Sequence, residues 1–296
     1  MPFQIDYEHE PGRLVRGRTV LPGGDQPLPW VLIVHGFKGF MDWGFFPELA
    51  RRLAGRGVAT VAFNTSGSGI GADLETFSEE RAFESDTLSR QLEDLDRVRS
   101  RALSGALGRL DPARAGLFGH SRGGGIAILH AAEHGDYRAL ATWAAVSTFD
   151  RYDEATLDLW RREGRLRVHN ARTGQDLYVG VQALDDLLQN RERLDIAAAC
   201  ARLPTPALFV HGEQDESVPV SSLDALLAAC AVARALRVPG AGHTLGARHP
   251  LAAIPPELHR VLETTSDWFE RHLSGPYAGT SAEPPSERGR SPSPRG

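Results

Sequence analysis

The residue best placed to do chemistry in this sequence is a serine flanked by glycines. Ser121 is the centre of the Gly-x-Ser-x-Gly segment 119–123, which follows an apolar run and leads into the helix-forming run 126–132. On such a strand-to-helix turn, a serine is held in a strained backbone conformation that lifts its hydroxyl out of the sheet. Gly119 and Gly123 supply the small residues needed where the two backbones pass closely. The same segment also fits a glycine-rich turn whose serine only caps a helix.

A serine hydroxyl is barely nucleophilic at neutral pH, so it needs a base within hydrogen-bond reach. Two further loops follow apolar runs and offer partners, because Asp215 lies in 211–219 and His243 lies in 239–244. Loops that follow parallel strands emerge at one edge of the sheet, where ligands bind. The chain order serine, acid, histidine is the order of one particular hydrolase architecture. We therefore expect the three side chains to meet.

Other residues compete for these roles. Glu213 and Glu216 are neighbours of Asp215 and could replace it as the acid. His249 and His259 are the nearest competing histidines, but the first precedes a proline and the second lies in a predicted helix. The proposed base itself could also be an ordinary solvent-exposed loop histidine.

Hydrophobic periodicity predicts the elements that position these loops. Continuous apolar runs are typical of strands buried on both faces of a mainly parallel sheet, and they fall at 30–34, 58–63, 115–120, 139–146, 206–210 and 235–238. Partial alternation predicts a half-exposed edge strand at 13–21. Helical spacing predicts helices at 46–56, 86–103, 126–132, 222–231 and 256–273. We assign the charges of 86–103 to a solvated face. The alternation predicts an α/β fold with helices on both faces of the sheet.

Residues 148–203 interrupt this alternation. They read as a charged helix, a small hairpin around 172–174 and a second helical run. A segment this long between two core strands is usually functional, so we expect a lid over a pocket, with surface decoration as the alternative. We predict one domain over 1–274 that includes this insertion. Residues 275–296 are rich in Pro, Ser, Gly, Glu and Arg, a composition that predicts a disordered tail.

Bulk composition limits the class of protein. The chain has 296 residues with a net charge of −5, which favours neither a nucleic acid nor an anionic membrane as partner. Cys200 and Cys230 are in no metal-ligand spacing, and a reducing compartment is compatible. The first residues lack a signal-peptide pattern and no apolar run is long enough to span a membrane. We expect a cytoplasmic protein without a cofactor. A homodimer is left open.

Four motifs give the chain a resemblance to the α/β-hydrolase family over about residues 13–273. They are Gly119-His120-Ser121-Arg122-Gly123-Gly124, His35-Gly36-Phe37, the segment 212–219 and Gly240-Ala241-Gly242-His243. The set also looks like the esterase branch of dienelactone-hydrolase-like and feruloyl or cinnamoyl esterases.

The resemblance implies a role for each residue. Ser121 is the nucleophile and His243 the base, and Asp215 is preferred as the acid because it stands just before Ser217-Val218-Pro219. The backbone N–H groups of Phe37 and Arg122 form the oxyanion hole. The implied function is a serine carboxylic-ester hydrolase that works through an acyl-enzyme. A thioesterase, a small-peptide or amide hydrolase, and a non-catalytic binding protein are the alternatives.

The substrate is expected to be a small-molecule ester. Candidate substrate-binding residues are His35, Lys38, His120, Trp160 and Tyr178. The aromatic residues could equally form the core of the lid, and Lys38 and Arg122 could attract a carboxylate or be solvated. A glycine pattern at 67–72 matches a dinucleotide fingerprint only weakly, because no tight strand–turn–helix unit surrounds it. No metal site is expected, since the histidines do not cluster at ligand spacing.

Overall fold

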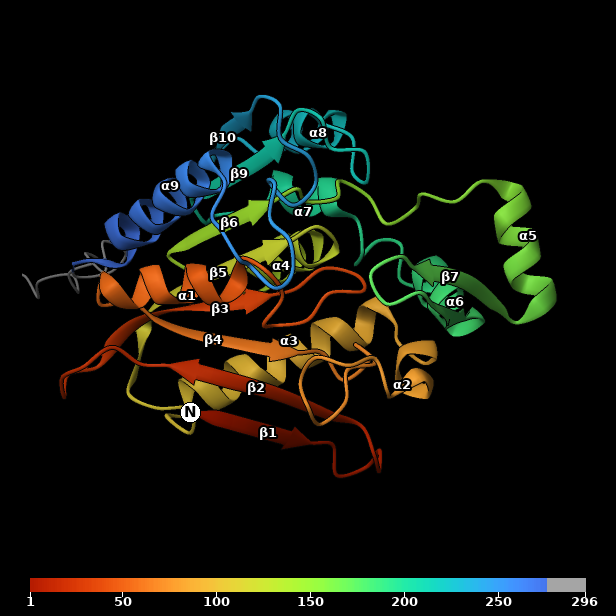
Figure 1. Cartoon of the computed structure of the whole chain (residues 1–296), viewed down its shortest axis with the longest axis horizontal. Helices are drawn as coiled ribbons and strands as arrows, with labels where there is room; N and C mark the ends of the chain where they lie inside the picture. The colour runs from red at the N-terminus through yellow and green to blue at the C-terminus, as the bar shows by residue number, and fades with distance from the viewer. Residues whose placement is uncertain (276–296) are drawn as a thin grey trace, which may run out of the picture.

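A twisted sheet runs through the middle of the molecule (Figure 1). The candidate residues lie on loops that follow the carboxyl ends of its strands. The computed structural model describes residues 1–275, so the predicted tail at 275–296 lies outside the described residues except for its first residue. Within the described chain the sheet has eight strands, in the order β1-β2-β4-β3-β5-β6-β9-β10. The strands are β1 (Pro2–Asp6), β2 (Leu14–Val20), β3 (Leu28–Val34), β4 (Ala59–Asn64), β5 (Leu110–His120), β6 (Ala139–Trp143), β9 (Ala207–Gly212) and β10 (Ala233–Val238).

The strands β4, β3, β5, β6, β9 and β10 run parallel to one another, as the continuous apolar runs predict. Each of these runs contributes apolar side chains to both faces of the sheet. In β3, Trp30, Leu32 and Val34 join one hydrophobic cluster, while Val31 and Ile33 join a second. Side chains of a strand point alternately to opposite faces, so the two clusters are the two sides of the sheet.

Helices cover both faces of the sheet (Figure 1). The first cluster receives α3 (Leu88–Leu103), α4 (Arg122–His134), α7 (Ile196–Ala201) and α8 (Ser221–Ala229). The second receives α1 (Phe46–Gly55) and α9 (Pro256–Leu273). The α/β prediction is confirmed, and the last helix has the predicted bounds.

The outermost strand of the sheet is not the one predicted from the sequence. Residues 13–21 were expected to form an edge strand, but β1 pairs with β2 on its outer side, in a register that places Ile5 opposite Val15. Both β1 and β2 run antiparallel to their neighbours. Within β1 only Ile5 is buried, so the segment carries too little hydrophobic pattern to be predicted as a strand.

The inserted segment leaves the sheet after β6 and projects to one side (Figure 1). It consists of α5 (Glu154–Glu163), a hairpin of β7 (Arg165–Asn170) and β8 (Gln175–Gly180), and α6 (Val181–Gln189). Its apolar side chains form a third cluster with residues that follow β3 and β4, and α2 (Glu80–Glu84) packs beside β8. The predicted boundary of 148–203 is too wide, because α7 packs into the main core through the buried Ile196 and Ala199.

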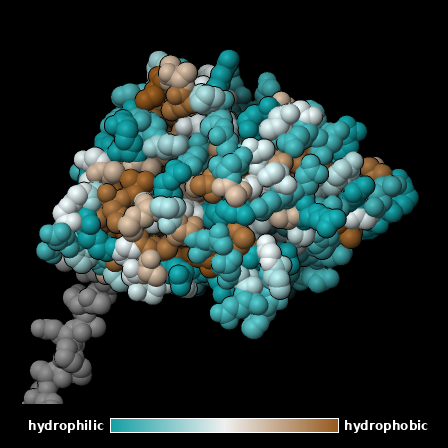
Figure 2. All heavy atoms as spheres, turned by 60° about the horizontal axis from the view of Figure 1, so that its bottom comes forward, coloured by the Kyte–Doolittle hydropathy of each residue, from teal (hydrophilic) through white to brown (hydrophobic). Residues whose placement is uncertain are grey.

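Most buried hydrophobic side chains of the described residues belong to these three clusters. On the face shown in Figure 2, hydrophilic residues cover most of the surface and hydrophobic ones form separate patches. No helix within residues 1–275 combines the length and the apolar character that crossing a lipid bilayer requires. The large apolar side chains exposed in the described chain are Met1, Leu159, Val232 and Ile254.

One charge of α3 is buried, contrary to the expectation of a fully solvated polar face. The Asp94 side chain has 0% exposure, accepts a 2.6 Å hydrogen bond from the Tyr7 hydroxyl and a 2.7 Å bond from the Ser66 amide, and pairs with Arg13 at 3.2 Å. Its carboxylate therefore joins α3 to the segment between β1 and β2 and to the loop after β4. Removing one member of such a buried network leaves the polar groups that contacted it without a partner.

We predict that Asp94→Ala lowers the free energy of unfolding by about 3 kcal/mol, because it leaves the Tyr7 hydroxyl and the Ser66 amide without their acceptor. It also removes the fully buried carboxylate that pairs with Arg13, while Glu10 and Glu93 still contact that arginine. The matched control is Glu93→Ala, which removes a 54% exposed carboxylate that contacts the same arginine and is expected to cost less than about 1 kcal/mol. Urea unfolding followed by fluorescence measures both, and equal losses would contradict the buried network.

Candidate active site

Ser121 lies on a sharp turn between β5 and α4, in the conformation predicted for it. Its φ of 57° and ψ of −121° are strained for a residue with a side chain. A Cβ on Gly119 would lie 2.3 Å from the Gly123 carbonyl oxygen, and one on Gly123 would lie 2.3 Å from the His35 oxygen. Only glycine fits at these two positions. The Ser121 side chain makes no capping hydrogen bond to α4, so the helix-cap alternative is wrong.

Asp215 follows β9 and is held as an ionised carboxylate. Its Oδ1 accepts the amides of Ser217 and Val218, both at 2.9 Å, and its Oδ2 lies 2.8 Å from Nδ1 of His243. His211 Nε2 is 3.4 Å from the same Oδ2. Burial alone would raise the pKa of Asp215, but the hydrogen bonds from His211, His243 and the Val218 amide hold that pKa well below its usual range. The acid is therefore a fixed negative acceptor.

His243 lies in the loop after β10, and its backbone carbonyl is 3.1 Å from Nε2 of His120. Its side chain is 22% exposed and lines the same cavity as Ser121. Because Nδ1 of His243 faces a carboxylate, that nitrogen carries the proton and Nε2 is free to accept one. The predicted order of serine, acid and histidine thus corresponds to three loops around one cavity.

The competing residues lie elsewhere or are already engaged. Glu213 and Glu216 are exposed, beside the buried Asp215. His249 accepts the Gly44 amide on Nδ1 at 3.0 Å and contacts a glutamate through Nε2. His259 is exposed on α9. None of these four lines the cavity that holds Ser121 and the loop histidine.

The loop after β3 lies directly against Ser121. A Cβ on Gly36 would be 3.0 Å from the serine Cβ, and the turn is closed by a 3.0 Å hydrogen bond from the Gly39 amide to the Gly36 carbonyl. Among the described residues, the amides of Phe37 and Arg122 have no hydrogen-bond acceptor. Two free donors beside a serine are the arrangement that an oxyanion requires.

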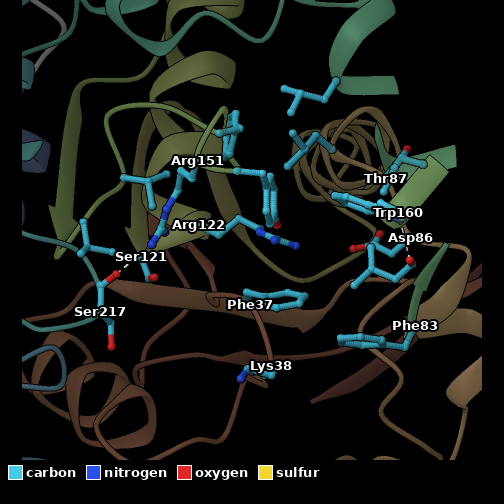
Figure 3. Close-up of a pocket in the computed structure, with 18 of the residues that line it drawn as sticks. Phe37, Lys38, Phe83, Asp86, Thr87, Ser121, Arg122, Arg151, Trp160 and Ser217 are labelled. Atoms are coloured by element: carbon cyan, nitrogen blue, oxygen red, sulfur yellow. Dashed lines mark hydrogen bonds between the residues drawn. The ribbon is translucent and has the colours of Figure 1, made fainter. Parts of the chain in front are cut away.

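The cavity around Ser121 has a volume of about 460 Å³ and is roofed by the inserted segment (Figure 3). Its wall combines apolar side chains of α5, β8 and α6 with polar groups from the sheet edge. Its lining residues are Phe37, Lys38, Phe83, Asp86, Thr87, Leu88, Ser121, Arg122, Val146, Phe149, Arg151, Tyr152, Trp160, Val179, Ala183, Leu187, Ser217, Val218 and His243. This volume fits a small-molecule ligand.

Two of the five predicted substrate-binding residues, Lys38 and Trp160, line the cavity. The other three do not. His35 is buried below the loop, where its Nε2 accepts the Thr65 amide at 3.3 Å. His120 supports the histidine loop, and Tyr178 points to the Arg165 guanidinium, which lies 4.0 Å from its ring centroid.

Sequence reasoning missed several cavity residues. Asp86, Phe83 and Tyr152 lie far from the motifs along the chain, and their side chains reach the cavity only through the fold. Asp86 had been placed at the start of a solvated helix. The sequence did offer one indication that Asp86 lies at the cavity. Asp86 stands just before α3, beside the loop after β4, and that loop also lies at the carboxyl edge of the sheet.

The histidines do cluster at one place, contrary to expectation. His130 and His134 are one turn apart near the end of α4, and their Nε2 atoms lie 3.0 and 2.6 Å from Oδ1 of Asp96. The three ligand atoms are within 4.8 Å of one another. The hydrogen bonds already satisfy these atoms, and Tyr137 contacts the other nitrogen of His130 at 3.1 Å. The cluster joins α3 to α4 and lies at the opposite end of α4 from Ser121.

We predict that acid destabilises the protein partly through His35 and His120. Burial lowers the pKa of His35 to about 4, and burial with the neighbouring His243 lowers that of His120 to about 3. The unfolded chain binds these protons below about pH 6.5 and the folded chain does not, so the free energy of unfolding falls as pH drops from about 6.5 to about 4.

The corresponding variant is His120→Gln, which removes one titrating group. Its free energy of unfolding should depend on pH less steeply than that of the wild type, by up to about 1.4 kcal/mol per pH unit. Urea unfolding between pH 4.5 and 7.5 gives both slopes. Parallel curves for the two proteins would show that His120 is not held neutral.

Comparison with known proteins shows which family has this architecture. The profile of the alpha/beta hydrolase family matches residues 31–254. A curated relative, the uncharacterized peptidase YuxL of Bacillus subtilis, is 25% identical over 288 residues. That match covers 92% of this chain but 39% of the relative, so the chain spans about two-fifths of the relative's length.

Solved structures share the fold. Est1E from Butyrivibrio proteoclasticus, in a structure with ferulic acid bound, has a TM-score of 0.66 at 20% identity, covering 92% of this chain and 100% of that one. The esterase domain of a Rhodothermus marinus protein has a TM-score of 0.61 at 21% identity, and the dienelactone hydrolase of Anabaena variabilis has 0.57 at 18%. These two cover 92% of this chain and 99% of theirs. The chain belongs to the alpha/beta hydrolase family.

Proposed function

We propose that the chain is a serine carboxylic-ester hydrolase with Ser121, His243 and Asp215 as its catalytic triad. The observation that carries the proposal is the 2.8 Å contact between Asp215 and His243 beside the same cavity as the strained Ser121 turn. A buried carboxylate on Nδ1 fixes the imidazole tautomer and leaves Nε2 as the base.

In the first half of the reaction, Oγ of Ser121 attacks the ester carbonyl carbon and its proton passes to Nε2 of His243. The new Oγ–C bond displaces the carbonyl π pair onto oxygen, and the amides of Phe37 and Arg122 stabilise this negative charge. The pair then returns, the bond to the alcohol oxygen breaks, and that oxygen takes the proton from His243. Asp215 stabilises the imidazolium in between and stays ionised.

In the second half, a water molecule repeats these steps on the acyl-enzyme. His243 takes a proton from the water as the water oxygen attacks the acyl carbon, and the bond to Oγ of Ser121 breaks. The serine oxygen takes the proton back, and the carboxylic acid product leaves. We further infer that the segment formed by α5, β7, β8 and α6 acts as a lid that limits the access of water.

Amide hydrolysis is the second candidate, because the curated relative is named a peptidase. The same triad serves both reactions, and fold does not decide between them. The small roofed cavity of about 460 Å³ suits a small molecule better than a protein chain, so it favours a small ester or amide over a protein substrate. Cytoplasmic location and self-association stay predictions.

We expect Ser121→Ala to reduce hydrolysis of p-nitrophenyl butyrate by at least about 10,000-fold, because the acyl-enzyme has no oxygen on which to form. A fluorophosphonate probe should label the wild type at Ser121 and leave the variant unlabelled. The control Ser147→Ala changes a serine of the neighbouring loop outside the cavity and should keep both properties. Full turnover by folded Ser121→Ala would falsify the proposal.

Replacing the acid tests its assignment against its neighbours. We expect Asp215→Asn to lower kcat by about 1,000-fold or more, because the amide cannot stabilise the imidazolium and favours the wrong tautomer. The matched controls Glu213→Gln and Glu216→Gln alter exposed carboxylates within two residues and should stay within about twofold of the wild type. A large loss in either control, with Asp215→Asn active, would move the acid to that position.

A further inference from the structure

The Arg122 side chain occupies the cavity without a partner for its charge. Its guanidinium carbon lies 3.8 Å from the centre of the Phe37 ring, and Figure 3 shows it extending from Ser121 toward Asp86 and Trp160. Within residues 1–275, no hydrogen bond or ion pair satisfies its five N–H donors. Burial lowers the pKa of Arg122, which is the mark of a cation removed from water.

The other charges near Arg122 do not neutralise it. Lys38 and Arg151 line the same cavity, and each donates instead to a backbone carbonyl, at 2.8 and 2.9 Å. The acidic group of the wall, Asp86, attracts the arginine electrostatically, but it is hydrogen-bonded to Gln91 and forms no direct ion pair with Arg122. Burial raises the pKa of Asp86 to about 7, so part of its negative charge is lost at neutral pH. The cavity therefore has an excess of positive charge.

A half-buried guanidinium whose N–H groups find no acceptor in the protein is poorly compensated, and its planar donors match a carboxylate in two parallel hydrogen bonds. We propose that the substrate carries a carboxylate that binds Arg122, in addition to the ester bond that Ser121 attacks. This inference rests on the proposed function, because it names the substrate class of the same site. It makes Arg122 a specificity residue through its side chain, apart from the role of its amide.

The surroundings favour a carboxylate over a phosphate. The planar pair of donors on one guanidinium matches the two oxygens of a carboxylate, and the nearby Lys38 and Arg151 each donate to a backbone carbonyl. The rest of this part of the wall is apolar, with Phe83, Trp160 and Val179. A single carboxylate at the end of a short hydrocarbon or aromatic spacer matches this combination.

Matched pairs of esters test the proposal. One pair places the carboxylate on the acyl side, as p-nitrophenyl hemiglutarate against p-nitrophenyl valerate, and the other places it on the alcohol side, as 4-acetoxybenzoate against p-tolyl acetate. The readout is the ratio of kcat/KM for the anionic to the neutral ester. We expect a wild-type ratio of about 10 or more in at least one pair, since a charge-assisted hydrogen bond is worth about a factor of ten.

Two variants distinguish the contribution of the Arg122 charge from that of its planar donors. Arg122→Met should reduce that ratio by about tenfold or more, and Arg122→Lys should retain part of it, because the ammonium keeps the charge without the planar fork. The matched control Arg101→Met removes an exposed arginine at the end of α3 and should keep the wild-type ratio. Ratios that are the same in the wild type and Arg122→Met for both pairs would overturn the carboxylate subsite.

Binding to a protein that cannot turn over distinguishes failure of this inference from failure of the proposed function. Calorimetry with Ser121→Ala should show monomethyl glutarate binding more tightly than dimethyl glutarate, and the difference should disappear in Ser121→Ala/Arg122→Met. If this difference in binding is found but the wild type hydrolyses no ester, the proposed function is refuted and the carboxylate subsite is supported. Hydrolysis of neutral esters with equal binding of the two glutarates would refute the subsite and keep the function.

Discussion

Close contact between three backbones is the constraint on which the rest of the structure depends. The end of β5, the start of α4 and the loop after β3 meet around Ser121, and Gly119, Gly123 and Gly36 leave no room for side chains between them. This contact forces the positive φ of the serine and sets the two free amides beside it. A strained residue persists only where its surroundings over-determine it. Here the buried sheet on one side and α4 on the other supply that rigidity.

The sequence predicted those features whose cause is local or periodic. Apolar runs such as 30–34 identified the parallel strands, and glycines at fixed offsets identified the Ser121 turn. The meeting of Asp215 with His243 was predicted because a parallel sheet brings all strand-end loops to one edge. Local pattern and global architecture agree at these positions, which is why the placement of these loops could be predicted from the sequence.

Features decided by distant partners could not be predicted. Asp94 looks like any charge on a helix until Tyr7 and Arg13 are brought beside it. His120 was expected near the substrate, but it contacts the carbonyl of the histidine loop instead. β1 is a strand because β2 offers it an edge, since its own sequence has little hydrophobic pattern. In each case, the deciding interaction joins residues that are far apart in the sequence.

The third hydrophobic cluster gives the inserted segment a core apart from the rest of the fold. Trp160, Leu177 and Leu184 of the inserted segment pack with Phe77 and Phe83, outside the two clusters that hold the sheet and its helices. Units with separate cores open at different free energies, as hydrogen exchange records for cooperative subdomains. The shape of the cavity can thus vary by substitution within this small core while the sheet that fixes Ser121 stays unchanged, so the molecule can acquire a new specificity without rebuilding its chemistry.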